Sequence, residues 1–167
     1  MDDLIDRLRN CLDENPDGDI YVLGEVIAKR YSSRDDAEYV FDIGSYAYQH
    51  KIQVPEVIAL HNLDISSRVS RLLRLKPIKD WFLFMQRIEG KHINSLEGMD
   101  YSEALKQLKK QIEKLFDLRI HPIDATFNGN SIFNPKERKL YLIDFDAWEK
   151  VPKGEEVDRS IVLRTCS

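Results

Sequence analysis

Several features that mark other classes of protein are scarce in this chain. Two cysteines in 167 residues, Cys11 and Cys166, are too few for a disulfide scaffold and lack the spacing of metal ligands. No apolar run approaches the length that crosses a membrane, and Asp2, Asp3 and Asp6 stand where a secretory signal would be cationic and then apolar. We therefore expect a cytoplasmic protein.

An excess of positive charge is also missing. The formal net charge is −4, which argues against general coating of nucleic acid. A local basic cluster is still present, and we interpret it as a solvated face, with RNA binding as the alternative; its members are Arg68, Arg71, Arg74, Lys76 and Lys79. With 43% hydrophobic residues, the chain can form one compact domain or two small lobes that share a cleft.

The pattern of apolar residues predicts alternating helices and short strands. Residues 2–12 place their apolar side chains on one helical face, and residues 20–23 and 25–28 flank Gly24 as a hairpin that leads to Lys29. Ser33 is predicted to cap a second amphipathic helix, which Pro55 follows. From Asp100, a third helix with an apolar stripe continues to residue 116, and that stripe is expected to be core.

Polar residues follow the apolar runs between residues 115 and 149. Residues 131–133 read as a strand, 134–138 as a turn and 140–143 as the returning strand that leads to Asp144. This hairpin places Asn130 and Asp144 at neighbouring strand ends. Their oxygens suit a hard cation such as Mg²⁺, and Asp124, one loop away, is positioned to orient an attacking hydroxyl. Structural alternatives are an exposed turn carboxylate for Asp144, a turn residue for Asn130 and a solvated lysine for Lys29.

The same residues, taken in order, resemble the protein-kinase-like superfamily. That family has an H-x-D…N element before a strand pair and a D-F-G triplet, which here reads Asp144-Phe145-Asp146 after His121, Asp124 and Asn130. The stretch 26–29 resembles the strand with the phosphate-pairing lysine, and 82–90 resembles the strand and hinge of the adenine pocket. The tail, residues 155–163, is similar to the V-D-x-x-V-L segment that closes the kinase of the KEOPS tRNA-modification complex. Together with the RIO kinases, that family is the nearest likeness, over roughly residues 20–163.

The resemblance implies a fold class and a division into lobes. The expected fold is α+β, a minimal two-lobe protein-kinase-like fold with a small antiparallel N-terminal sheet plus a helix and a truncated, mainly helical C-lobe. Residues 1–89 would form the N-lobe and 90–167 the reduced C-lobe, with the boundary near the hinge at Glu89 and Gly90.

The resemblance also implies a set of site residues for ATP and Mg²⁺. Lys29 would pair with the phosphates, Asn130 and Asp144 would hold the metal, and Asp124 would be the catalytic acid–base residue. The nucleotide site would further include the gatekeeper Met85, backbone groups of Gln86 and Ile88, and an acidic partner of Lys29 that is either Glu38 or Asp42. His121 would have a structural role. Together, these groups would grip a magnesium-triphosphate between two lobes.

Three departures from the family pattern leave the activity open. Only Gly18 and Gly24 precede Lys29, so a Gly-rich loop is missing; the spacing from His121 to Asp124 to Asn130 is longer than usual; and the chain ends about twenty residues after Asp144. We expect an atypical serine/threonine-kinase-like phosphotransferase that phosphorylates itself, a protein or a small alcohol, or hydrolyses ATP. The alternatives are a catalytically impaired pseudokinase that binds nucleotide and an RNA-associated regulatory module.

Overall fold

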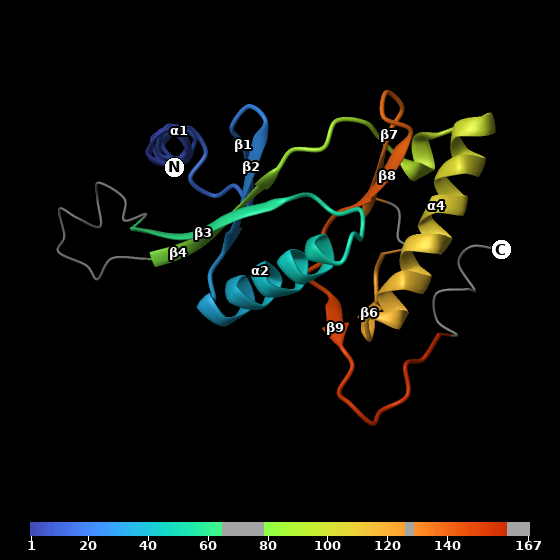
Figure 1. Cartoon of the computed structure of the whole chain (residues 1–167). Helices are drawn as coiled ribbons and strands as arrows, with labels where there is room; N and C mark the ends of the chain where they lie inside the picture. Colours follow the sequence, from blue (N-terminus) through green and yellow to red (C-terminus); the bar gives the residue numbers. More distant parts are fainter. Residues whose placement is uncertain (65–78, 126–128, 160–167) are drawn as a thin grey trace. The chain divides into compact units, whose positions relative to one another are not determined.

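The computed structural model describes residues 1–64, 79–125 and 129–159 (Figure 1). The chain divides into two compact units. The first contains residues 1–42 and 56–87, and the second contains residues 43–55 and 88–167. The expected division after residue 89 differs mainly in that residues 43–55 group with the second unit.

A four-stranded antiparallel sheet forms the first unit. Its strands are β1 (Ile20–Val22), β2 (Val26–Tyr31), β3 (Val57–Asp64) and β4 (Lys79–Gln86), in the order β1-β2-β4-β3. The predicted hairpin around Gly24 is confirmed, because β1 pairs with β2 and Gly24 has a φ of 80° in the turn. Lys29 lies within β2, between Ile20 on one neighbouring strand and Leu83 on the other.

Helix α1 (Asp2–Glu14) supplies one side of the core of the first unit. Its buried side chains Ile5 and Leu8 pack with Tyr21 and Leu23 of the hairpin and with Phe82 of β4. Asp2 and Asp3 in the first turn lie where the helix dipole favours negative charge. The predicted helix over residues 2–12 is therefore confirmed, and its apolar face is held by the sheet.

Helix α2 (Arg34–Gln49) begins in the first unit and ends in the second. The Ser33 hydroxyl accepts a hydrogen bond from the backbone N–H of Asp36 at 3.3 Å, so Ser33 caps the helix as predicted. Asp35 and Asp36 add negative charge at the same end.

The second unit is built on helix α4 (Gly98–Asp117), which contacts β6 (Ile120–Pro122) and β8 (Lys139–Leu142). The predicted stripe is core: Leu108, Ile112, Leu115 and Phe116 are all buried. Strand β7 (Ser131–Asn134) pairs with β8 in the predicted hairpin, and Gln107 of α4 secures its far end. The Gln107 amide donates to the Arg138 carbonyl at 2.9 Å and accepts from the Leu140 N–H at 2.9 Å.

Two short pairings complete the second unit. Strand β5 (Lys91–His92), followed by the 3₁₀ turn η1 (Ile93–Ser95), pairs with β7. Strand β6 pairs with β9 (Trp148–Lys150), with His121 opposite Glu149. The sequence prediction did not contain this β6–β9 pair.

Arg119 anchors the chain that follows β9. It has a φ of 59°, and its carbonyl accepts a hydrogen bond from the Val151 N–H at 2.8 Å. Its guanidinium donates to the carbonyls of Val151 at 3.3 Å, Pro152 at 2.5 Å and Glu155 at 2.6 Å. One side chain therefore fixes the path of residues 151–155 through their backbone.

Within the described part of the chain, the search for a helix with the length and apolarity of a membrane span found none. Of the basic cluster predicted from the sequence, only Lys79 falls in that part, as an exposed residue at the start of β4. The other four members lie outside the described residues, and so does the end of the tail motif from residue 160 onward.

Candidate active site

His121, in β6, opens the loop that carries the predicted catalytic residues. The imidazole of His121 stacks on the Phe116 ring, with 6.2 Å between centroids and 27° between planes. Its Nε2 is buried and has no hydrogen-bond partner among the described residues. Packing against the end of α4 agrees with the structural role that the resemblance assigned to His121.

Asn130 connects the two polar residues of this loop. Its Nδ2 donates to the Asp124 carboxylate oxygen Oδ2 at 2.9 Å and to the Asp124 backbone carbonyl at 3.1 Å. A carboxylate and a carbonyl can only accept, so the nitrogen must be the amide atom that faces Asp124. The amide therefore orients Asp124 and turns its own oxygen, Oδ1, in another direction.

The β7–β8 hairpin sets the position of Asp144 relative to Asn130. Ser131 lies opposite Leu142, and the Ile143 N–H donates to the Asn130 carbonyl at 2.9 Å. Asp144 is thus one residue beyond the partner of Asn130. The predicted proximity of these two strand ends is observed in the backbone pairing.

Asp144 and Phe145 point in opposite directions, Asp144 to the surface and Phe145 to the interior. Asp144 has a φ of 60°, a left-handed conformation that Asp tolerates better than most residues but that still costs about 1 kcal/mol or more. Asp144 is exposed, whereas Phe145 is 1% exposed and packs against Trp148 with 5.6 Å between ring centroids. Phe145 and Trp148 hold the turn from inside and leave the Asp144 carboxylate at the surface.

The donor chemistry of these residues fits a hard cation. Asn130 offers an amide oxygen and Asp144 a carboxylate oxygen, which are the ligand types that Mg²⁺ prefers in proteins. No group of three or more His, Cys, Asp or Glu in the described ranges could by itself hold a metal ion. A kinase-type site takes part of its oxygen set from phosphates, so two protein donors are compatible with it.

The predicted nucleotide residues of the first unit lie on its sheet and on α2. Lys29 is half-buried, and its ammonium lies 5.8 Å from the centre of the Tyr31 ring. Glu38 accepts a hydrogen bond from Arg34 Nε at 2.8 Å in an exposed ion pair, and Asp42 is exposed. The acidic partner of Lys29, and the position of Lys29 opposite Asn130 and Asp144, stay predictions.

The predicted hinge residues lie at and beyond the end of β4. Met85 is 5% exposed and is paired with Ile27 of β2. The N–H of Gln86 donates to the Glu56 carbonyl at 2.9 Å, so an adenine contact from the Gln86 backbone would have to come from its carbonyl. Ile88 is half-buried in the loop that follows.

Gly90 has a role that the sequence prediction missed. A Cβ at this position would lie 2.3 Å from the Phe133 carbonyl oxygen and 2.7 Å from the Ile132 side chain. Only glycine lets β5 approach β7 at this point. A single glycine directly before a short strand was the available signal.

Comparison with known proteins gives a likeness of fold. No model of a known protein family and no curated protein sequence matches the chain. Among solved structures, it is similar to the kinase PK-1 of Cydia pomonella granulovirus, with a TM-score of 0.54 and 10% sequence identity. The match covers 75% of this chain and 44% of the viral kinase, so the chain spans less than half the length of that protein.

The viral kinase supports the predicted fold class. At this level of identity the likeness concerns the fold alone, and the nearer resemblance to the RIO and KEOPS kinases stays a prediction. The antiparallel sheet with a helix in the first unit, and α4 with its short strands in the second, agree with the expected α+β architecture. The chain has a minimal protein-kinase-like fold.

Proposed function

We propose that this protein is a phosphotransferase that uses ATP and Mg²⁺, in the manner of an atypical serine/threonine kinase. One observation carries the proposal: Asn130 holds Asp124 through its amide nitrogen, while the β7–β8 pairing places Asp144 beside it. A phosphoryl-transfer site needs an oriented carboxylate next to oxygen donors for a metal, and these three residues supply that combination.

Each residue has a defined task in the proposed reaction. Asp124 orients the acceptor hydroxyl and takes its proton, and the hydrogen bonds from Asn130 restrict the directions in which its carboxylate can point. Oδ1 of Asn130 and the Asp144 carboxylate are the oxygens that would hold Mg²⁺. When bound, the ion neutralises charge on the phosphate oxygens. Lys29 pairs with the phosphates and positions them.

Incubation of the purified protein with Mg²⁺ and labelled ATP tests this function. Asp144→Ala and Asp124→Ala should each reduce phosphate transfer or release by about a thousandfold or more, because each removes several kcal/mol of transition-state stabilisation. Glu113→Gln is a matched control, since Glu113 is an exposed carboxylate on α4 of the same unit. Full turnover by Asp144→Ala would refute the assignment.

A binding module without turnover is the second candidate, and the first unit offers a specific reason. Helix α1 precedes the β1–β2 hairpin, and the turn of this hairpin contains one glycine, Gly24. Backbone amides of a Gly-rich loop are therefore not available to hold phosphates. Stabilisation against heat by ATP or ADP in the presence of Mg²⁺, without phosphate release, would favour this candidate. A nucleotide concentration of a hundred times Kd would raise the free energy of unfolding by about 2.7 kcal/mol.

The proposal covers several acceptors of the phosphate and includes an RNA partner as an alternative. A protein serine, a small alcohol, the protein itself and water all use the same donor machinery. RNA binding that falls steeply with salt would support an RNA-associated role for the basic cluster, and binding independent of salt would contradict it.

A further inference from the structure

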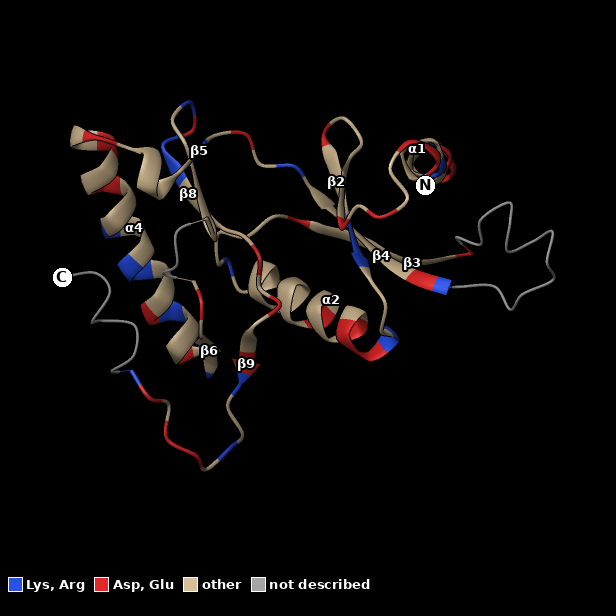
Figure 2. Cartoon of the chain, turned by 180° about the vertical axis from the view of Figure 1, so that it is seen from behind, with Lys and Arg blue, Asp and Glu red and all other residues tan. Residues whose placement is uncertain are grey.

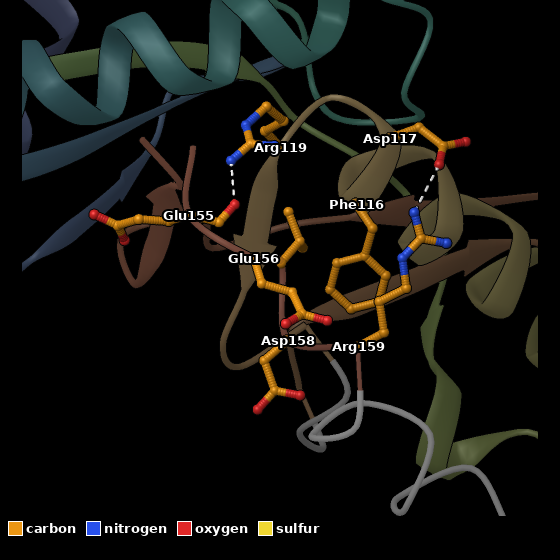
Figure 3. A pocket seen from close by; sticks show the side chains of 8 residues that line it. Phe116, Asp117, Arg119, Glu155, Glu156, Asp158 and Arg159 are labelled. Carbon is orange, nitrogen blue, oxygen red and sulfur yellow. Dashed lines mark hydrogen bonds and ion pairs between the residues drawn. The ribbon is translucent and has the colours of Figure 1, made fainter. Parts of the chain in front are cut away.

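A groove runs along the C-terminal end of α4 in the second unit (Figure 3). Its volume is about 960 Å³. Phe116, Asp117 and Arg119 line one side, and residues 155–159 line the other. None of these residues has a part in the proposed phosphotransfer.

The wall formed by residues 155–159 is fixed at both ends. Arg119 donates to the Glu155 carbonyl at 2.6 Å, as the dashed line in Figure 3 shows. Four residues later, Arg159 donates to the Asp117 carboxylate at 3.1 Å. A groove whose wall is already ordered can bind a partner without a further loss of chain entropy.

Arg159 shows what kind of group the groove accepts. Its guanidinium carbon lies 5.7 Å from the centre of the Phe116 ring, while its Nη2 reaches Asp117. The ring face attracts the cation, and the carboxylate accepts its N–H groups. The groove therefore already holds one guanidinium, supplied by the chain itself.

The remaining charge of the groove is negative. Four carboxylates line the groove, those of Asp117, Glu155, Glu156 and Asp158, against two guanidinium groups, so its net charge is negative. In Figure 3 the Glu156 carboxylate lies beside the Phe116 ring, whereas the carboxylates of Glu155 and Asp158 point away from it. Figure 2 shows the acidic residues of the chain after β9 in red, with a basic residue in blue on either side of them.

We propose that this groove docks an arginine-rich segment of a partner protein. The charge of the groove calls for a cationic occupant, and the guanidinium of Arg159 over the Phe116 ring favours a guanidinium over an ammonium. In this arrangement Arg159 occupies the place over the Phe116 ring and competes with an arginine of the partner for it. The proposal does not depend on phosphotransfer by the same chain.

Binding of a labelled peptide of alternating arginine and glycine to the full chain, without nucleotide, tests the proposal. Glu156→Gln combined with Asp158→Asn should weaken binding by about tenfold at low salt. Asp13→Asn combined with Glu14→Gln removes the same charge from the exposed end of α1 and should leave the affinity unchanged. Equal weakening by both double variants would overturn the proposal, because only net charge would then matter.

Two further binding measurements test the place over the Phe116 ring. Arg159→Ala should tighten binding several-fold, since freeing Phe116 and Asp117 and removing a positive charge outweigh the loss of an exposed ion pair at one end of the wall. Weaker binding by this variant would refute the competition. A lysine–glycine peptide of the same length should bind several-fold more weakly than the arginine peptide. Equal affinity for the two peptides, or no binding of the arginine peptide at all, would refute arginine recognition.

Discussion

Asp124 and Asn130 give the sharpest test of the site geometry, because their contact predicts a difference between two substitutions of one residue. Asn130→Ala removes both hydrogen bonds from Nδ2, the 2.9 Å bond to the Asp124 carboxylate and the 3.1 Å bond to the Asp124 carbonyl. A hydrogen bond to a charged group contributes about 1.5–3 kcal/mol and a neutral one about 0.5–1.5 kcal/mol. Because both residues are only half-buried, we expect a loss of about 2 kcal/mol in the free energy of unfolding.

Asn130→Asp keeps the shape of the side chain and places a second carboxylate against Asp124. At the observed separation of 2.9 Å, two unit charges repel by about 5–6 kcal/mol at an effective dielectric constant of 20. Protonation of one carboxyl relieves this repulsion, so the penalty depends on pH. At pH 7 Asn130→Asp should be less stable than Asn130→Ala by about 1–3 kcal/mol. Below about pH 4 a protonated carboxyl can donate as the amide did, and the order should reverse.

Urea unfolding followed by far-UV circular dichroism, at neutral pH and near pH 4, measures both variants against the parent chain. Glu113→Gln serves as the control, because Glu113 is an exposed carboxylate on α4 of the same unit. Equal stability of the alanine and aspartate variants at neutral pH would show that the amide does not face Asp124. The assay needs neither nucleotide nor metal, so it tests the geometry separately from the activity.

Three other predictions concern stability. Gly90→Ala should destabilise the chain by several kcal/mol, because the added Cβ would collide with the Phe133 carbonyl. Gly98→Ala should cost only about 1 kcal/mol, because Gly98 has a φ of 58° but open space around it. Thermal unfolding compares the two variants, and equal costs would contradict the close approach at Gly90. Burial and the hydrogen bond to Glu137 raise the pKa of Tyr141 to about 12, so the neutral phenol adds stability below pH 10 that is lost as the pH rises from 10 to 12. Tyr141→Phe should flatten stability over that alkaline range, and an unchanged profile would contradict the assignment. Asp80→Asn should cost about 2–3 kcal/mol in urea unfolding because it removes the buried carboxylate that pairs with the half-buried guanidinium of Arg30, and a cost below 1 kcal/mol would refute that role.

The elements that the sequence predicted are those in which local chemistry decides the structure. The helix at residues 2–12, the hairpin around Gly24 and the strand pair on either side of residues 134–138 were all recognisable from periodicity and turn residues. In the last case, the Asn134 side chain accepts from the N–H groups of Lys136 and Glu137, so the turn stabilises itself.

The elements that were missed depend on distant partners. Strands β6 and β9 are three residues each, and each is extended only because it pairs with the other across more than twenty residues. Nothing in the local pattern around His121 and Pro122 indicated a strand. Likewise, the hydrogen bonds from Asn130 to Asp124 join residues whose spacing is longer than usual for the resemblance, so the spacing alone could not establish them.

Arg119 binds residues 151–155 through carbonyl oxygens, and this has an evolutionary consequence. Every residue type carries a carbonyl, so substitutions among these five positions can accumulate without loss of the anchor. Replacement of the single arginine would release the entire segment. In a collection of homologues, we therefore expect residue 119 to be nearly invariant while the stretch that it secures drifts freely.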